Sequence, residues 1–322
     1  MNYDIIGDVH GHGDKLEALL AKLGYQHRAG HWSHRGRLAI FVGDFIDRGP
    51  HQLKTVDCVR RMIDAGSALA VMGNHELNAI AWHTPDPLQP GEFLRPHAHP
   101  RWGAKNRHQH AQFLAEVEHD PVRHGEVINW FKTLPLWLDL PEIRVVHACW
   151  HQPSMDFLKP RLGAASTLPD ALLAAAVVEP TDQEATEAQN LSVFSAVETL
   201  TKGIEIPLPA PHAFHDKDGI ERRRVRIRWW DPDATDYPRA ALLDSKQAEV
   251  LPRMPIPPQA RVHVPCSKPL FFGHYWLHGQ PGPLGPHVAC VDFSVGKGGK
   301  LAAYRFDGEE ALMQEHFVWV GP

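Results

Sequence analysis

The chain has 322 residues, enough to bury a large core, and its 33 Lys and Arg nearly balance its 38 Asp and Glu. This balance excludes a strong overall attraction to nucleic acid or to anionic membranes. The four cysteines stand far apart without a CxxC pair, and no apolar run approaches the roughly 18 residues of a membrane helix, which favours a reduced, cytoplasmic protein.

The first quarter of the chain alternates predicted strands and helices. Three apolar runs are typical of buried strands: Tyr3 to Ile6, Leu38 to Val42 and Ala68 to Met72. Between them, Asp14 to Leu23 and Leu53 to Ala65 carry apolar residues at helical spacing, and a glycine follows each. This order of elements predicts an α/β core.

The next part of the chain is predicted to cover one side of this core. Residues 83–110 are rich in Pro and His, above all from His83 to Trp102, and we interpret them as a loop or cap that borders the site. Ala111 to Leu134 is predicted to be helical in two pieces, broken near Asp120 and Pro121.

The character of the chain changes in residues 155–220, where Ala171 to Val178 and Gln189 to Leu200 are predicted helices. We interpret this block as an insertion into a single domain that spans residues 1–322. The remaining predicted strands are Ile143 to Val146, Val225 to Trp230, Leu270 to Phe272 and two closing strands between Val288 and Arg305. A glycine-rich hairpin turn, Gly296 to Gly299, joins the closing strands and lacks the surroundings of a phosphate-binding loop.

Polar side chains follow five of the predicted strands. In an open α/β sheet, sites form at the carboxyl ends of the strands, so we expect these side chains to meet. Five motifs carry them: Gly7 to Gly11 (GDVHG), Gly43 to Gly49 (GDFIDRG), Gly73 to Glu76 (GNHE), Val146 to Ala148 (VHA) and Gly273-His274 (GH).

The motifs supply ligands for two metal ions. Asp8 and His10, one residue apart, can reach one ion, and Asp44 has two carboxylate oxygens with which to bridge to a second. Neutral ligands remain for that second ion: Asn74, His147 and His274. A set of carboxylate, imidazole and amide groups without thiolate suits divalent ions such as Mn, Fe or Zn. Two ions about 3.5–4 Å apart would activate a bridging water and hold the attacking and leaving oxygens of phosphoryl transfer.

Three residues beside these ligands are candidates for proton transfer and substrate binding. His75 can protonate the leaving oxygen as a general acid, and Asp47 can orient its ring. Arg48 has a planar guanidinium suited to two phosphate oxygens. The alternative is that Asp47 and Arg48 pair with each other and only stiffen the turn.

The chain has 23 histidines, far more than one metal centre can hold. A lone histidine in a polar stretch is more often found outside the core than in a site. We therefore interpret the following as surface or loop residues: His27, His31, His34, His97, His99, His108, His110, His119 and His124.

Together the motifs resemble the phosphoprotein phosphatase branch of the calcineurin-like metallophosphoesterases, which includes bacterial diadenosine-tetraphosphatase-like enzymes and Ser/Thr phosphatases. In the other large branch a second His follows the last GH pair after one residue, and here Trp276 occupies that place. The resemblance implies a four-layer αββα sandwich and two divalent metal ions. Manganese is the leading candidate for these ions, with iron, zinc, nickel or cobalt as alternatives. It also implies direct attack by a metal-bridging water, without a phosphoenzyme.

The family also uses a second phosphate-binding arginine. Trp229 to Pro232 (WWDP) is similar to a Trp-Ser-Asp-Pro stretch in the same interval, which makes Arg228 or Arg239 the candidate. A strand predicted from Glu221 to Trp230 would place four arginines on one face: Arg222, Arg224, Arg226 and Arg228. That face is either a solvated basic edge or an electropositive rim for a phosphate-rich substrate, and the sequence leaves both open.

Two kinds of substrate fit the resemblance: a dinucleoside polyphosphate or another nucleotide, and a protein phosphorylated on Ser, Thr or Tyr. Nucleic acid fits only as a substrate with a phosphorylated end. No membrane partner is expected, and the sequence leaves the oligomeric state open. A different class of function is a non-catalytic phosphate-binding module on the same fold. That alternative predicts a lost metal ligand, and none is lost here.

Overall fold

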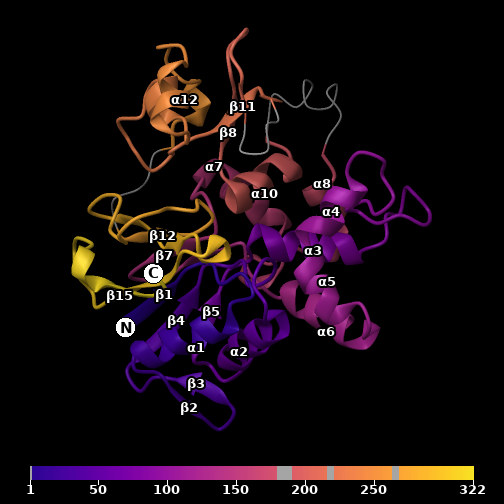
Figure 1. Cartoon of the computed structure of the whole chain (residues 1–322), viewed down its shortest axis with the longest axis vertical. Coiled ribbons are helices and arrows are strands. Elements are labelled where there is room, and N and C mark those ends of the chain that lie inside the picture. Colours follow the sequence, from indigo (N-terminus) through magenta and orange to yellow (C-terminus); the bar gives the residue numbers. More distant parts are fainter. Residues whose placement is uncertain (1, 180–190, 216–220, 263–267) are drawn as a thin grey trace.

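The computed structural model describes residues 2–179, 191–215, 221–262 and 268–322, and it has a mixed α/β fold built on two main sheets (Figure 1). The first sheet has the order β14-β15-β1-β4-β5, with β16 paired to β15. Its strands are β1 (Asn2–Ile6), β4 (Arg37–Phe41), β5 (Ala68–Ala70), β14 (Asp292–Phe293), β15 (Lys300–Phe306) and β16 (Phe317–Val320). β1 runs parallel to β4, and β4 to β5, which confirms the three strands predicted in the first quarter of the chain.

The second sheet has the order β13-β12-β7-β6. β12 pairs in parallel with β13 and β7, and β6 is antiparallel to β7. Its strands are β6 (Trp137–Asp139), β7 (Arg144–Val146), β12 (Leu270–Phe272) and β13 (Val288–Cys290). The prediction of two closing strands is wrong in one respect, because the chain forms three: β13 in this sheet, then β14 and β15 in the first. The chain passes between the sheets at Val291, which is fully buried.

The two sheets face each other across an apolar layer. Ile5 of β1 and Ile40 of β4 are fully buried there, with Val145 of β7, Phe271 of β12 and Tyr304 of β15. Alternate residues of a strand point to opposite faces, so this layer takes only every second residue of each strand. The shared layer fixes the sheets against each other, and with them the strand ends that carry the motifs.

Helices α1 (Gly13–Lys22) and α2 (Gln52–Asp64) cover the other face of the first sheet (Figure 1). α1 buries Leu16 and Leu20, and α2 buries Val59. They pack on strand residues that point away from the second sheet, among them Ile6, Ala39 and Phe41. Both helices were predicted, and the structure confirms them.

Four helices follow β5: α3 (Asn74–His83), α4 (Gly103–Gln109), α5 (Ala111–Val117) and α6 (Pro121–Phe131). The break predicted near Asp120 is confirmed, because the Asp120 side chain accepts a hydrogen bond from the backbone N–H of Arg123 at 3.0 Å and caps α6. The stretch 83–110, predicted as a loop or cap, includes α4 near its end.

The described parts of residues 152–262 contain short helices and strands joined by irregular segments. They are α7 (Gln152–Leu158), α8 (Leu173–Val177), α10 (Val193–Lys202), β8 (Glu205–Pro207), β9 (Phe214–His215), β10 (Glu221–Arg222), β11 (Arg224–Arg226), α11 (Tyr237–Ala240) and α12 (Ser245–Glu249). α8 and α10 correspond to the two predicted helices, although residues 189 and 190 lie outside the described residues. α10 packs on α7 and α8, and α8 contacts α3.

The continuous strand predicted from Glu221 to Trp230 is wrong. β10 ends at Arg222 and pairs with β9, whereas β11 ends at Arg226 and pairs with β8. A bend at Arg223 separates them, so the alternation of side chains is interrupted and the arginines do not share one strand face.

The remaining elements are short. A hairpin of β2 (Gln26–Arg28) and β3 (His31–Ser33) follows α1. Single 3₁₀ turns are η1 (Lys159–Arg161), η2 (Ala164–Ser166), η3 (Asp170–Leu172), η4 (Pro258–Ala260), η5 (Val295–Lys297) and η6 (Gln314–His316). Among the helices of the described residues, none has the length and apolar character needed to cross a membrane.

Candidate metal centre

Five strand ends from the two sheets meet in one place. The residues that follow them are Asp8 and His10 after β1, Asp44 after β4, Asn74 after β5, His147 after β7 and His274 after β12. All six side chains are buried, and none is more than 8% exposed. The structure therefore brings together the residues predicted as metal ligands.

The first group of close side chains consists of His10, Asp44 and His75, whose ligand atoms lie within 4.8 Å of one another. His10 Nε2 lies 3.8 Å from Asp44 Oδ2, and His75 Nε2 lies 3.9 Å from the same oxygen. His10 Nδ1 donates to the Ile46 carbonyl at 3.1 Å, which leaves the lone pair of the neutral ring on Nε2. That nitrogen has no hydrogen-bond partner among the described residues.

The second group consists of Asp44, His147 and His274, and it shares Asp44 with the first. His147 Nδ1 donates to the Val42 carbonyl at 2.7 Å, so Nε2 of the neutral ring carries the lone pair. This Nε2 faces Asp44 Oδ2 at 3.4 Å and Asn74 Oδ1 at 3.2 Å. Acceptor atoms this close repel one another unless a cation or a proton lies among them. Both ring nitrogens of His274 are buried without a partner in the part of the chain described.

Asp8 lies beside these two groups and belongs to neither. Its carboxylate accepts a hydrogen bond from the backbone N–H of His274 at 3.0 Å. Burial, together with Asp292 and Asp44, raises the pKa of Asp8 well above its ordinary value. Buried carboxylates this close need positive charge nearby, and divalent cations would supply it. The unpartnered nitrogens and the crowded carboxylates thus fit a metal centre.

Glu76 holds the Asp44 turn in place. Its carboxylate accepts hydrogen bonds from the backbone N–H groups of Asp44 and Phe45, both at 2.8 Å, and of Gly73 at 3.0 Å. Burial, reinforced by Asp44, raises the pKa of Glu76 to about 7. A Cβ at Gly73 would lie 2.2 Å from Asp44 Oδ1, so only glycine fits there. Sequence reasoning missed this role, although the Glu of the GNHE motif was a signal for it.

Asp47 connects two histidines. His75 Nδ1 donates to Asp47 Oδ2 at 2.5 Å, and His110 Nδ1 lies 2.8 Å from the same oxygen, outside the direction of a hydrogen bond. Although burial alone would raise it, His110 and His75 hold the pKa of Asp47 well below its usual range. Against the effect of burial, Asp44 and Asp47 raise the pKa of His75. The ring of His75 is therefore held in one orientation and favoured in its protonated form, as a general acid requires.

Two histidines expected at the surface or in loops are buried instead. His110 is 1% exposed, and its ring centre lies 6.3 Å from that of Trp82. His124 is 9% exposed, and its ring centre lies 4.4 Å from that of His83. Both expectations are wrong, because the burial of these histidines depends on how α3 to α6 pack and not on their neighbours in sequence. The others of that set are half-buried or exposed, as expected.

Arg48 lies at the mouth of the centre. Its side chain is exposed, and its Cζ lies 4.5 Å from the ring centre of Trp276. Because Asp47 contacts His75 and His110 while Arg48 lies over the indole, these contacts run against the alternative in which Asp47 and Arg48 pair.

The two arginines predicted as candidates for a second phosphate contact are engaged elsewhere. Arg228 donates to the backbone carbonyls of Arg239 at 3.1 Å and Leu243 at 3.3 Å. Arg239 forms ion pairs with Asp231 at 3.3 Å and Asp233 at 3.2 Å. Their part in substrate binding stays a prediction.

Arg226 is the arginine of this segment whose charge acts on the centre. Burial, and after it the charge of Arg226, lower the pKa of His274 well below its usual value. The Arg226 guanidinium pairs with Glu205 at 2.9 Å, and its Nε is buried without a partner among the described residues. The sequence showed Arg226 only as one member of a basic run.

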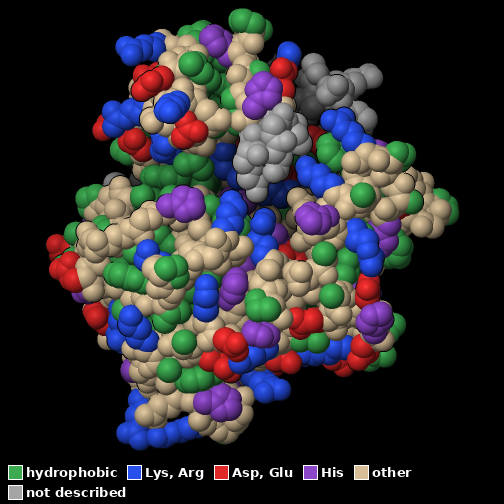
Figure 2. Space-filling view, viewed as in Figure 1, with side chains coloured by type: hydrophobic (Ala, Val, Ile, Leu, Met, Phe, Trp, Pro, Cys, Tyr) green, Lys and Arg blue, Asp and Glu red, His purple; other side chains and the backbone are tan. Residues whose placement is uncertain are grey.

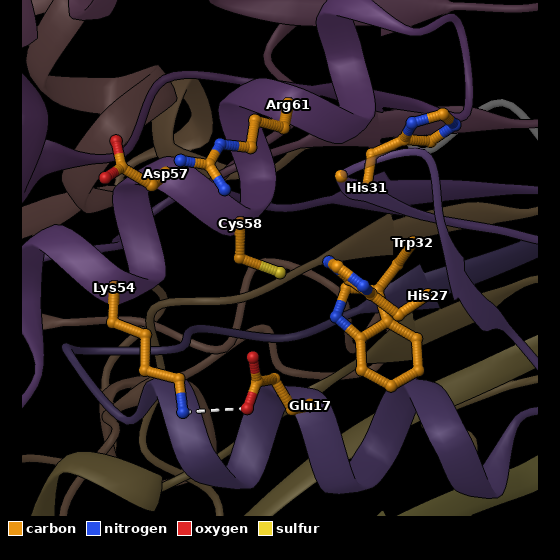
Figure 3. Close-up of a pocket in the computed structure, with 9 residues that line it drawn as sticks. Glu17, His27, His31, Trp32, Lys54, Asp57, Cys58 and Arg61 are labelled. Carbon is orange, nitrogen blue, oxygen red and sulfur yellow. Dashed lines mark ion pairs between the residues drawn. The ribbon is translucent and has the colours of Figure 1, made fainter.

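A separate hollow of about 200 Å³ lies between α1, α2 and the β2–β3 hairpin (Figure 3). Its lining includes His27, Trp32 and Cys58, and the Lys54 ammonium pairs with the Glu17 carboxylate at 2.7 Å beside it (Figure 3). It shares no residue with the two groups around Asp44, so we assign it no part in the metal centre.

The profile of the family described as calcineurin-like phosphoesterase matches residues 1–170, more than half of the chain. The chain belongs to this family. The match to the calcineurin-like phosphoesterases includes the first four motifs, whereas β12 and the His274 that follows it lie beyond it.

Similar proteins were found over shorter stretches. The chain is 50% identical over 76 residues to the asymmetrical bis(5'-nucleosyl)-tetraphosphatase PrpE of Halalkalibacterium halodurans, which is 23% of this chain and 31% of that protein. It is 32% identical over 149 residues to the protein of the same name from Oceanobacillus iheyensis, which is 46% of this chain and 55% of that protein. The matches thus span about a third and about half of these relatives.

Among solved structures, the cold-active protein-tyrosine phosphatase of a psychrophile Shewanella is 17% identical, with 96% of this chain and 78% of that chain covered and a TM-score of 0.48. A protein serine/threonine phosphatase from Saccharomyces cerevisiae is 13% identical, with 100% of this chain and 80% of that chain covered and a TM-score of 0.48.

Proposed function

We propose that the protein is a metal-dependent phosphoesterase in which two divalent cations are held by Asp8, His10, Asp44, Asn74, His147 and His274. The position of Asp44 carries this proposal, because its carboxylate belongs to both groups of close ligand atoms and can bridge two ions. The unpartnered nitrogens of His10 and His274 support it. Manganese is the first candidate, and iron, zinc, nickel or cobalt suit the same donor set.

In this proposal the chain's own groups position the phosphate and move the proton. Divalent cations bound by these six residues would supply Lewis acidity and lower the pKa of a bound water. Arg48, at the mouth, binds two oxygens of the reacting phosphate. His75 donates its proton to the leaving oxygen, and Asp47 keeps the ring in the orientation that aims Nε2 at the centre. Arg226 is a further candidate for contact with the phosphate, beside the predicted Arg228 and Arg239.

The proposal extends to the architecture. The two facing sheets, with α1 and α2 outside the first, support a four-layer αββα sandwich. We propose one catalytic domain over residues 1–322, with residues 83–110 as a cap and residues 155–220 as an insertion. His110, at the end of the cap, contacts Asp47. This contact supports a position of the cap beside the centre.

We propose a nucleotide with a phosphoanhydride chain as the substrate class. The support is that both relatives described above are named bis(5'-nucleosyl)-tetraphosphatases, and that their matches have 50% and 32% identity. Phosphoproteins remain the other substrate class to be tested.

One screen tests the proposed function. The metal-free protein is reloaded with manganese, and in parallel with iron, zinc, nickel or cobalt, and each form is offered p-nitrophenyl phosphate, diadenosine tetraphosphate, a phosphopeptide and a 3′-phosphorylated oligonucleotide. We expect metal-dependent hydrolysis, fastest for diadenosine tetraphosphate. Hydrolysis of the phosphopeptide alone would contradict the substrate class, and no hydrolysis with any of the five candidate metals would favour a non-catalytic binding module.

A further inference from the structure

The glycine-rich turn between β14 and β15 lies against the metal centre. A Cβ at Gly296 would lie 2.8 Å from Arg48 Cδ, 3.0 Å from His10 Cδ2 and 3.2 Å from the Trp276 ring. A side chain at this position would have to displace Arg48, so the backbone of the turn packs closely against these groups. The turn therefore forms part of the wall of the site, and the next residue, Lys297, stands at its mouth. The sequence around the turn did not reveal this proximity.

Two cationic side chains share one aromatic ring at this mouth. Arg48 Cζ lies 4.5 Å and Lys297 Nζ 4.1 Å from the ring centre of Trp276. The two positive charges are therefore no farther apart than the sum of these distances. Both side chains are exposed, whereas Trp276 is half-buried. Contact with the indole offsets part of the repulsion between the cations, and an anion that touches both would offset more of it.

Asp292 fixes the indole and the turn relative to each other. Its buried carboxylate accepts hydrogen bonds from the backbone N–H of Trp276 at 2.7 Å and of Ser294 at 2.9 Å. Trp276 has φ +53° and Ser294 has φ +63°, conformations that persist only where the surroundings hold them. Lys297 thus extends from a preorganised turn, which lowers the entropic cost of binding a ligand there.

We propose that Lys297 binds the phosphate next to the one held by Arg48, so that the site prefers phosphoanhydrides of two or more phosphates over phosphate monoesters. Successive phosphates of such a chain share one oxygen, so a chain that begins at Arg48 reaches the other cation on Trp276 within a few bonds. Figure 2 shows Lys and Arg side chains gathered around a hollow near the middle of the face in view, a surface suited to a polyanion. The inference rests on the proposed function, because it takes Arg48 as the contact of the reacting phosphate.

The competing interpretation is that Lys297 only covers the indole of Trp276. In that case its charge would contribute to the stability of the fold and not to the choice of substrate. The variant Lys297→Met separates the two, because methionine keeps an unbranched apolar chain on the ring and removes the charge.

The test compares kcat/KM of the manganese-loaded wild type and Lys297→Met for diadenosine tetraphosphate and p-nitrophenyl phosphate. A charge-assisted contact with one phosphate corresponds to a loss of about 10-fold to 100-fold for diadenosine tetraphosphate, mainly in KM. We expect the loss for p-nitrophenyl phosphate to be about ten-fold smaller, because a monoester has no second phosphate. Equal losses for the two substrates, or an unchanged preference, would overturn the proposal.

Two further variants serve as controls. Lys297→Arg keeps a cation and should retain most of the preference for the phosphoanhydride. Lys300→Met changes a lysine of the same hairpin whose ammonium donates to the Gly279 carbonyl at 3.0 Å, so the ratio of the two kcat/KM values should not change. A loss of preference in Lys300→Met as large as in Lys297→Met would show that the hairpin responds to any lost charge, which also overturns the assignment.

A binding measurement tests Lys297 even without turnover. Calorimetry of the metal-loaded protein with inorganic tripolyphosphate and with inorganic phosphate should show weaker tripolyphosphate binding in Lys297→Met and equal phosphate binding in both proteins. Equal tripolyphosphate binding would overturn the inference. A wild type that binds tripolyphosphate through Lys297 but hydrolyses no substrate would contradict only the proposed function.

Discussion

Single residues at the centre differ in how far the sequence could identify them. Asp44 was found because its motif follows a buried strand, and the structure places its Oδ2 3.4 Å from His147 and 3.8 Å from His10. The contact of His110 with Asp47 could not be predicted, because it depends on where the fold places the connection between α4 and α5. Candidate ligands at strand ends can thus be recognised from the sequence, whereas a side chain that contacts the site from a distant loop cannot.

Replacement of His75 tests the acid assigned to the leaving group. His75→Asn should lower kcat by roughly 10²–10⁴-fold for substrates with poor leaving groups, the usual effect of losing a positioned general acid. The loss should be much smaller for p-nitrophenyl phosphate, because p-nitrophenolate departs without a proton. Equal losses on both substrates would mean that His75, which also lies near Asp44, acts as a metal ligand instead.

Replacement of His110 tests whether the second partner of Asp47 positions the acid. His110→Phe keeps an aromatic ring in the buried position and removes the contact with Asp47. We expect kcat on poor leaving groups to fall by about 10-fold to 100-fold, the usual cost of losing an outer partner of a metal site, with KM little changed. A purely structural role would instead lower the unfolding temperature and leave kcat of the folded enzyme unchanged.

At the scale of elements, each predicted strand that a motif follows is confirmed, whereas the predicted strands without a motif were correct only in part. β1, β4 and β5 are apolar runs that stop at Gly7, Gly43 and Gly73, and all three are confirmed. The crossing at Val291 and the bend at Arg223 were missed, because local composition does not show which partner strand a segment will choose. The basic strand face disappears for that reason, and a cation from the β14–β15 turn lies at the site instead.

The packing of α6 predicts an acid-sensitive fold. Burial, with a contribution from His83, lowers the pKa of His124 to about 4. The unfolded chain takes up a proton near pH 6.5, whereas the folded chain does so only near pH 4, so stability is full above about 6.5 and falls as the pH drops toward 4. Between pH 7 and pH 5, the unfolding temperature of His124→Gln should therefore fall less than that of the wild type.

His119 provides the matched control for this measurement, because it is exposed just before α6. His119→Gln should keep the wild-type dependence on pH. If His124→Gln loses as much stability at pH 5 as the wild type does, the acid sensitivity has another origin.

At the scale of the whole molecule, the two sheets are joined by an apolar layer and by a buried cluster of charges at one end of it. Asp8, Asp44, Glu76 and Asp292 are all at most 2% exposed. Burial of such a cluster opposes folding unless cations balance it. We therefore expect chelation of the bound metal to lower the unfolding temperature, and manganese to restore it. Calorimetry of the metal-free protein and of the protein with saturating manganese measures this difference. Identical unfolding temperatures of these two forms would contradict a metal centre.

The most direct test of the two-metal centre is the number of manganese ions bound per chain, measured by mass spectrometry of the dialysed protein in the wild type and in Asp44→Asn, with turnover followed in the same samples. Because Asp44 belongs to both groups of ligands, we expect two ions per chain in the wild type, and weakened binding at both sites with nearly all activity lost in the variant. Two tightly bound ions and wild-type turnover in Asp44→Asn would contradict this account.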